Sequence, residues 1–148
     1  MKYDTFVGKE YEAFTIEVEK GRIGLFAGAI GVDDPIYSDG DLARAAGYHA
    51  VPAPPTFPYS ITMDAGQSFN VLDDLGIRRE TAVHGGQRFV YHNPICAGDT
   101  VTGRQKVVDI HEKKGGALIF IETETRLWNQ DGNAVCDLYS TIIVRNGE

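Results

Sequence analysis

The segment from Gly31 to Phe57, GVDDPIYSDGDLARAAGYHAVPAPPTF, contains turn and helix-start signals that are typical of an active-site segment. A turn signal at Asp34-Pro35 is followed by a short apolar stretch and then a proline-rich entry into a longer element. A carboxylate such as Asp33 could exchange protons with a substrate, but a tyrosine such as Tyr37, with an ordinary pKa near 10, is a poor general base at neutral pH. The segment therefore predicts a site that lacks part of its proton chemistry.

His84 is the other residue whose surroundings suggest chemistry, in the stretch VHGGQ. Gly85 and Gly86 permit unusual dihedral angles or the close approach of a ligand. One interpretation makes His84 and Gln87 contacts to a bound molecule or to a water in a groove. The alternative is a histidine at a strand end that is hydrogen-bonded to a carbonyl.

Metal and nucleophile motifs do not stand out in the chain. No two histidines share the i, i+4 spacing of a helical metal site, and Cys96 and Cys136 have no metal-ligand spacing. There is no Gly-x-Ser-x-Gly elbow. We therefore predict neither a bound metal nor a thiol or serine nucleophile.

The bulk composition sets the class of protein. The chain has 148 residues, which favours one domain, and 24% of them are charged. The formal net charge of −7 disfavours non-specific nucleic-acid binding, which needs a basic face. The N-terminal stretch has no apolar signal core and no apolar run approaches membrane-spanning length, so we expect a cytoplasmic protein with free thiols and no membrane contact.

Apolar spacing predicts the helices. Ile23, Phe26, Ala27 and Ile30 form one helical stripe, and the stretch GDLARAAGY indicates a short helix that ends at Gly47.

A longer helix is predicted from about Pro55-Thr56 to about Phe69, because proline is tolerated in a first helical turn. In this helix Tyr59, Ile61 and Met63 are expected to be largely buried.

Period-2 alternation then predicts four consecutive strands, at about 82–93, 98–112, 115–130 and 133–146, after an early strand at 11–18. Asp131-Gly132 is a strong hairpin signal between the last two strands. This order predicts an α+β domain in which a curled antiparallel sheet wraps one long central helix.

Four stretches together resemble the MaoC-like dehydratases, specifically the N-terminal-type half of that family: AGAIGVDDPIYSD, AGYHAVPAPPTF, VHGGQRFVYHNPICAGDTV and TETRLWNQDGNAV. The resemblance covers the whole chain, 1–148, as one domain. It implies the hot-dog fold and a role in fatty acid metabolism, in the reversible hydration of an enoyl thioester to a 3-hydroxyacyl thioester. It implies no cofactor beyond the CoA or acyl carrier protein that carries the substrate.

Catalytic members of the family carry the motif Asp-x-Asn-Pro-x-His, whose Asp and His activate water. Alignment on Pro35 places Val32 at the Asp position, Asp34 at the Asn position and Tyr37 at the His position. Valine cannot exchange a proton. Asp33 lies one residue out of register and could substitute only if the local backbone turned differently.

The family also uses a backbone N–H beside a His-Gly pair, at the start of the central helix, to polarise the thioester carbonyl. Here Pro54 and Pro55 stand at that pair, and proline has no N–H to donate. Thr56 could offer its N–H or hydroxyl from the next position.

The resemblance therefore implies a non-catalytic half that shapes the acyl channel while a second hot-dog chain supplies the Asp and His. The substrate-binding residues it implies are Pro55, Thr56, Phe57, Tyr59, His84, Gly85 and Gln87. The aromatic residues among them could equally belong to the core. Unpaired sheet edges favour a homodimer or a heterodimer.

Two alternatives remain open from the sequence. The first is a self-sufficient homodimeric dehydratase or thioesterase that uses Asp33, Tyr37 or His84. The second is an acyl-CoA-binding module without enzymatic activity. The fold alone does not separate these possibilities.

Overall fold

The computed structural model describes residues 2–146 and shows an α+β domain, as the sequence predicts. The strands are β1 (Phe14–Glu17), β2 (Ala82–Tyr91), β3 (Thr100–Lys113), β4 (Leu118–Trp128) and β5 (Ala134–Arg145). The α-helices are α1 (Lys20–Ala29), α2 (Gly40–Ala45), α3 (Phe57–Asp64) and α4 (Asn70–Leu75). Short 3₁₀ turns lie at Asp4–Phe6, Pro35–Tyr37 and Arg79–Thr81.

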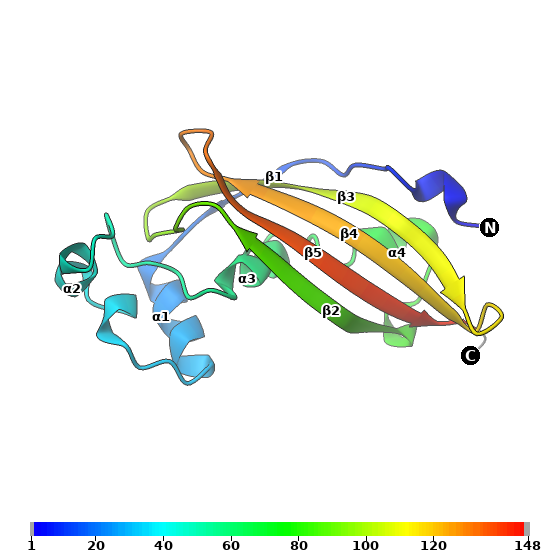
Figure 1. Ribbon diagram of the computed structural model, residues 1–148, viewed down its shortest axis with the longest axis horizontal. Coiled ribbons are helices and arrows are strands. Elements are labelled where there is room, and N and C mark those ends of the chain that lie inside the picture. Colours follow the sequence, from blue (N-terminus) through cyan, green and yellow to red (C-terminus); the bar gives the residue numbers. More distant parts are fainter. Residues whose placement is uncertain (1, 147–148) are drawn as a thin grey trace.

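All five strands form one antiparallel sheet in the order β1-β3-β4-β5-β2. Figure 1 shows the long, twisted sheet, with β1 along one edge and β2 along the other. The predicted hairpin at Asp131-Gly132 joins β4 to β5, and Gly132 adopts the left-handed backbone (φ 77°) that this turn needs. The four long strands predicted from alternation are thereby confirmed.

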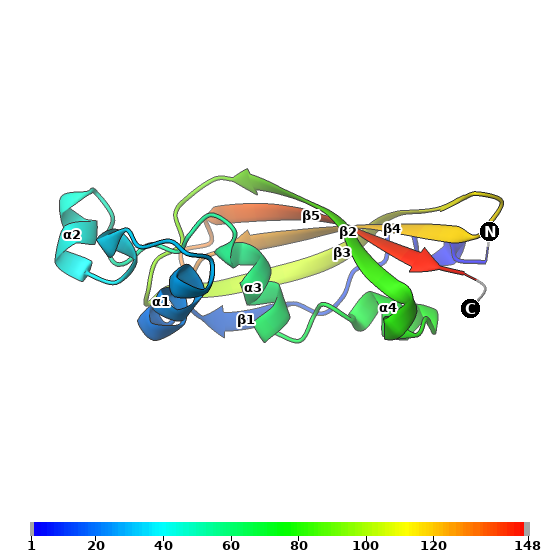
Figure 2. The ribbon, with the colours of Figure 1, turned by 90° about the horizontal axis from the view of Figure 1, so that it is seen from below.

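The helices α1, α3 and α4 lie on the same side of the sheet, whereas α2 projects beyond one end (Figure 2). Asp39 caps α2 by accepting hydrogen bonds from the backbone N–H groups of Asp41 and Leu42. Gly47, predicted to stop this helix, has φ 100°. No described helix is long and apolar enough to cross a membrane.

The prediction of one long central helix is wrong. The helix α3 ends at Asp64, and a second helix, α4, begins only at Asn70. Between them Gly66 takes φ 72°, a left-handed conformation that glycine adopts without strain and that ends an α-helix. Met63, expected to be buried, is 44% exposed, whereas Ile61 is 1% exposed, because residues two positions apart on a helix lie on different faces.

The inner face of the sheet explains why one continuous helix does not cover it. Apolar side chains form two separate clusters, one beneath α1 and α3 with Phe57 at its centre, and one beneath α4 around Val71. Between the clusters runs a row of polar residues that crosses four strands. This polar band consists of His84, Gln87, Gln105, Thr123, Thr125 and Ser140.

The packing under β1 depends on a glycine in β3. A Cβ atom on Gly103 would overlap the ring of Phe14 and lie 2.6 Å from Leu127 Cδ2. We expect Gly103→Ala to lower the free energy of unfolding by about 1–3 kcal/mol, because this core has no room for another methyl group. Urea unfolding of the purified chain measures the change.

Gly24→Ala is the matched control, since Gly24 lies within α1 and a Cβ there meets no atom within 4 Å. Alanine at this helical position should raise the stability by about 0.5–1 kcal/mol. Equal effects at the two glycines would contradict the packing described here.

Candidate functional site

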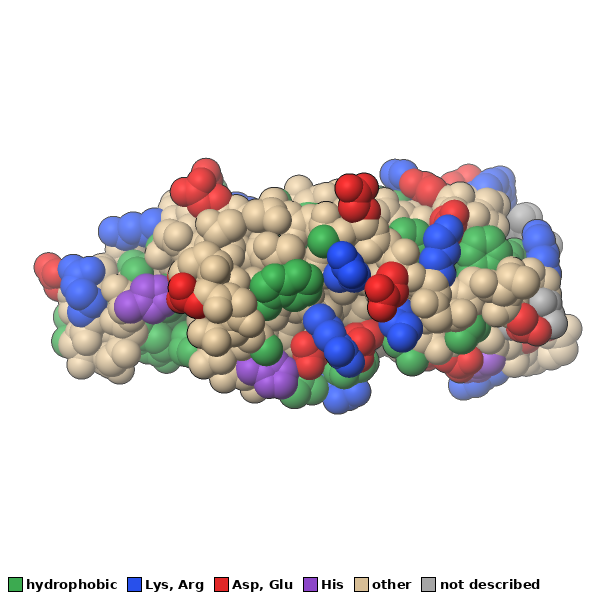
Figure 3. Space-filling view, turned by 90° about the horizontal axis from the view of Figure 1, so that it is seen from above, with side chains coloured by type: hydrophobic (Ala, Val, Ile, Leu, Met, Phe, Trp, Pro, Cys, Tyr) green, Lys and Arg blue, Asp and Glu red, His purple; other side chains and the backbone are tan. Residues whose placement is uncertain are grey.

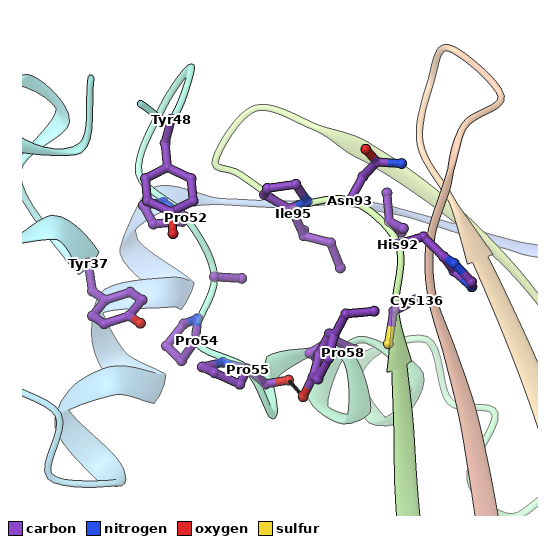
Figure 4. Close-up of a pocket in the computed structure, with 14 residues that line it drawn as sticks. Tyr37, Tyr48, Pro52, Pro54, Pro55, Pro58, His92, Asn93, Ile95 and Cys136 are labelled. Atoms are coloured by element: carbon purple, nitrogen blue, oxygen red, sulfur yellow. Dashed lines mark hydrogen bonds between the residues drawn. The ribbon is translucent and has the colours of Figure 1, made fainter. Parts of the chain in front are cut away.

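The start of α3 opens into a cavity of about 320 Å³, here called the mouth cavity. It is lined by Tyr37, Tyr48, Pro52, Ala53, Pro54, Pro55, Pro58, Tyr91, His92, Asn93, Pro94, Ile95, Val135 and Cys136. Figure 4 shows Tyr37 on one side of this space and Cys136 on the other, with Pro54 and Pro55 between them along one wall. The lining is mostly apolar and is shaped by rigid rings.

The backbone at the start of α3 offers few free N–H groups, because two of its residues are prolines. The N–H of Phe57 donates to the carbonyl of Pro54 at 3.0 Å, and the Tyr91 hydroxyl donates to the carbonyl of Pro55 at 2.7 Å. Pro54 and Pro55 have no N–H, so Thr56 provides the first N–H that this helix start can offer. Thr56 is exposed and does not line the mouth cavity.

The candidate proton-transfer residues of this segment do not converge. Tyr37 lines the mouth cavity, and burial, followed by the nearby Tyr48 and Asp34, raises the pKa of its hydroxyl above the ordinary value. A raised pKa leaves even less of the Tyr37 hydroxyl deprotonated at neutral pH, so Tyr37 is a still poorer candidate for the general base. Asp33 is exposed and lines neither this cavity nor the second one described below.

His92 is the histidine of the mouth cavity, and its ring is already engaged. Its Nε2 lies 2.9 Å from Asp137 Oδ2, and the ring points away from the cavity in Figure 4. Burial raises the pKa of the nearby Cys136 thiol to about 11, so this sulfur stays protonated and unreactive at neutral pH. The mouth cavity therefore holds neither a carboxylate nor an activated nucleophile among its lining residues.

A second cavity, of about 130 Å³, lies beneath the interruption between α3 and α4, and we call it the band cavity. Its lining comprises Tyr59, Thr62, Met63, Ser68, Phe69, Leu72, Arg79, Ala82, Val83, His84, Gln105, Thr123, Thr125, Leu138, Ser140 and Ile142. The polar band therefore supplies much of its floor. Pro58 on α3 and Cys136 on β5 line the mouth cavity, and their near neighbours Tyr59 and Leu138 line the band cavity.

Tyr59 and His84, both predicted as site residues, meet at the band cavity. The Tyr59 hydroxyl lies 3.0 Å from His84 Nδ1, and His84 Nε2 lies 2.8 Å from the carbonyl oxygen of Gly86. A carbonyl only accepts, so Nε2 carries the proton and Nδ1 accepts from the tyrosine. His84 thus forms the carbonyl contact that one interpretation of the sequence proposed, while its ring also borders the cavity.

Gln105 was missed by the sequence reasoning and is the most unusual residue of this site. It is only 8% exposed, and its Oε1 has no hydrogen-bond partner. The signal was present in the sequence: Gln105 occupies the same strand parity as Val101, Gly103 and Val107, which are all buried. A polar residue at a buried position of that kind points to a special environment.

The remaining predicted binding residues lie elsewhere. Phe57 is 2% exposed and packs edge-on against Phe26 with ring centroids 5.4 Å apart, so it belongs to the core. Gly85 lies at a register shift, where a Cβ would meet Ile143 Cδ1 at 2.5 Å. Gln87 Oε1 accepts from the Ser140 hydroxyl at 2.6 Å and does not line either cavity.

His49, Cys96 and Asp99 form a possible metal-ligating group among residues 2–146, with donor atoms within 4.8 Å of one another. The carboxylate of Asp99 is already used: it accepts from the Cys96 N–H at 2.9 Å and from Gln130 Nε2 at 3.2 Å. Burial raises the pKa of the Cys96 thiol, which disfavours the thiolate that a metal requires. Asp99 therefore caps the turn before β3.

Charge is distributed evenly on the face shown in Figure 3. Lysine and arginine side chains alternate there with aspartate and glutamate, and apolar groups form small separate patches. This face offers no continuous basic track.

The hydrogen bond between Tyr59 and His84 is testable. Tyr59→Phe should lower the free energy of unfolding by about 1 kcal/mol, since it removes one donor from a partly buried pair. The neutral His84 ring should keep its proton on Nε2 in both proteins, because Gly86 still accepts from it, and two-bond ¹⁵N–¹H NMR spectra report the tautomer.

Tyr48→Phe is the control, because none of the hydrogen bonds described for residues 2–146 uses the Tyr48 hydroxyl. A proton on Nδ1 of His84, or equal destabilisation by the two tyrosine variants, would contradict this geometry.

Comparisons with known proteins agree with the fold and extend it. Residues 5–138 match the family of the FAS1-like dehydratase domain region. A UPF0336 protein of Saccharopolyspora erythraea is 35% identical over 142 residues, which cover 95% of this chain and 90% of that protein.

Two solved structures are also similar. One is the C-terminally truncated HadBC complex, a 3R-hydroxyacyl-ACP dehydratase of Mycobacterium tuberculosis, with a TM-score of 0.79, 27% identity and coverage of 97% of this chain and 99% of that one. The other is the ChsH1–ChsH2 complex of the same organism, with a TM-score of 0.71, 23% identity and coverage of 94% and 91%. With its curled antiparallel sheet, its helices on one face and its match to the dehydratase region, the chain belongs to the MaoC-like hot-dog dehydratase family.

Proposed function

We propose that this chain is the acyl-binding subunit of a two-chain hydro-lyase. In this assembly it holds the acyl part of an enoyl thioester, carried by CoA or acyl carrier protein. A second hot-dog chain supplies the Asp and His that add water to form the 3-hydroxyacyl thioester or remove it again. The observation that carries the proposal is the mouth cavity, which has the position and apolar lining of a thioester site but no free base.

Hydration across an enoyl double bond needs a base that can exchange a proton near neutral pH. Tyr37, the residue at the position of the family's histidine, has a raised pKa, and Val32 cannot ionise. His92 is held by Asp137 and turned away from the cavity. The described residues of the mouth cavity therefore favour a division of labour with another chain.

The sheet has edges at β1 and β2, and we place the contact with the second chain at the β2 edge. Strand β2 pairs with β5 on one side, and no strand of residues 2–146 pairs with its other side. Exposed apolar side chains lie near it around the opening of the band cavity: Met63, Phe69 and Val83. A second hot-dog chain placed on this edge would pair the strand and cover these side chains.

The similar structures support the same arrangement. The HadBC dehydratase and ChsH1–ChsH2 are both complexes of two named components. The likeness covers 97% of this chain and 99% of the HadBC chain that it matches, which favours an equivalent subunit role for this protein.

Enzyme assays test the proposal directly. We expect no hydration of crotonyl-CoA or of a longer enoyl-CoA by this chain alone. Turnover should appear when it is co-purified with a hot-dog chain that carries Asp-x-Asn-Pro-x-His, for which a neighbouring gene is the first candidate. The loss of enoyl-thioester absorbance measures the rate.

Two variants act as controls. Replacement of the motif Asp of the second chain by Ala should abolish turnover, whereas Asp33→Ala in this chain should change it by less than about twofold, because Asp33 lies outside both cavities. Turnover by this chain alone would overturn the proposal and direct attention to Tyr37 and His84.

The proposed contact surface is tested by Val83→Glu. Val83 is 52% exposed on β2, so the variant chain should fold with an unchanged Tm. A charge buried at the contact should weaken association by at least about tenfold, or about 1.4 kcal/mol, in sedimentation or titration experiments.

Val108→Glu is the matched control, because Val108 is similarly exposed, at 46%, but lies on β3. Unchanged affinity for the Val83 variant, or equal losses for both, would exclude the β2 edge as the contact.

A further inference from the structure

The geometry points to a specific preference in the band cavity: it binds a hydroxylated segment of the acyl chain, whose hydroxyl donates to Gln105 Oε1. This inference rests on the proposed function and names the class of acyl thioester that the site would take. It starts from the one buried side-chain acceptor that the described residues leave unpaired.

An unpaired buried acceptor is costly. Leaving a carbonyl oxygen without a donor forfeits the hydrogen bond it would make in water, a loss of about 1–3 kcal/mol. The amide of Gln105 is therefore expected to have a partner in the working protein. Because its Oε1 is an acceptor, that partner must be a donor such as a hydroxyl group.

The neighbours of Gln105 do not satisfy it. Thr125 lies directly across from it in the sheet, and Thr123 lies two residues away on the same strand, yet neither hydroxyl bonds to Oε1. The next polar residues, Ser140 and Gln87, bond to each other: the Ser140 hydroxyl donates to Gln87 Oε1 at 2.6 Å. Gln105 is one of the residues that line the band cavity, among side chains that could also contact a polar group.

The position of the cavity suits an acyl chain that enters at the mouth. Pro58 lines the mouth cavity and Tyr59 the band cavity, and on β5 the same holds for Cys136 and Leu138. We infer that an acyl chain that runs along α3 would reach the band cavity from the mouth cavity. An unsubstituted alkyl segment would leave Gln105 Oε1 without a hydrogen bond, whereas a hydroxyl at the right depth would supply one.

Binding measurements on the two-chain complex test this inference. The probes are stearoyl-CoA and a series of hydroxystearoyl-CoAs that differ only in the position of the hydroxyl. At one position we expect binding roughly tenfold tighter than for stearoyl-CoA, the size of one recovered hydrogen bond to a buried acceptor. Gln105→Met, which keeps the side-chain volume and removes the amide, should abolish that preference.

Gln87→Met is the matched control, since its amide oxygen is already occupied by Ser140 and the preference should survive its loss. The Tm of the ligand-free Gln105→Met chain should equal or exceed that of the wild type, because an unpaired acceptor is removed. A lower Tm would show that Gln105 is already satisfied and would overturn the inference.

The outcomes separate the two proposals. Binding of stearoyl-CoA without any hydroxyl preference, or a preference that persists in Gln105→Met, would overturn this inference alone. Failure of every acyl-CoA to bind to the complex would overturn the proposed function as well.

Discussion

The arrangement of the whole inner face depends on one constraint: polar side chains cross the sheet between two apolar clusters. Thr123 and Thr125 on β4 are buried at 2% and 5% exposure, between the positions of Ile121 and Leu127 that belong to different clusters. A continuous apolar helix laid across this band would desolvate hydroxyl and amide groups without pairing them. The band therefore favours a helix that stops on one side and starts again on the other.

The interruption between α3 and α4 follows from that constraint and has two consequences. It leaves a space above the polar band, the band cavity, instead of a filled core. It also turns Met63 and Phe69 outward beside the free β2 edge. Under the proposed function, the same break in the helix both makes room for an acyl chain and creates the apolar rim that a second chain covers.

The sequence predicted the strands well because alternation is a local signal, and the Asp131-Gly132 turn and the Gly47 stop were local too. The helix break was missed because Gly66 is compatible with a helix by pattern alone; the polar band that makes a break favourable lies on strands far away in the chain. Tyr59 and His84 were both predicted as binding residues from the sequence. Their hydrogen bond to each other was not predicted, because it depends on how α3 packs against β2.

Under the proposed function, the mouth and band cavities divide the tasks of substrate handling along α3. At the mouth, Pro54 and Pro55 restrict the backbone, and Tyr91 anchors the Pro55 carbonyl, so the entry is shaped by rings that need no rearrangement. If a second chain carries out the proton exchange, as proposed, this chain can place prolines where a catalytic relative needs an N–H. Under the further inference, selectivity would be set deeper, where the buried amide of Gln105 would discriminate between acyl chains because an unsatisfied polar group costs more than a missing methylene group.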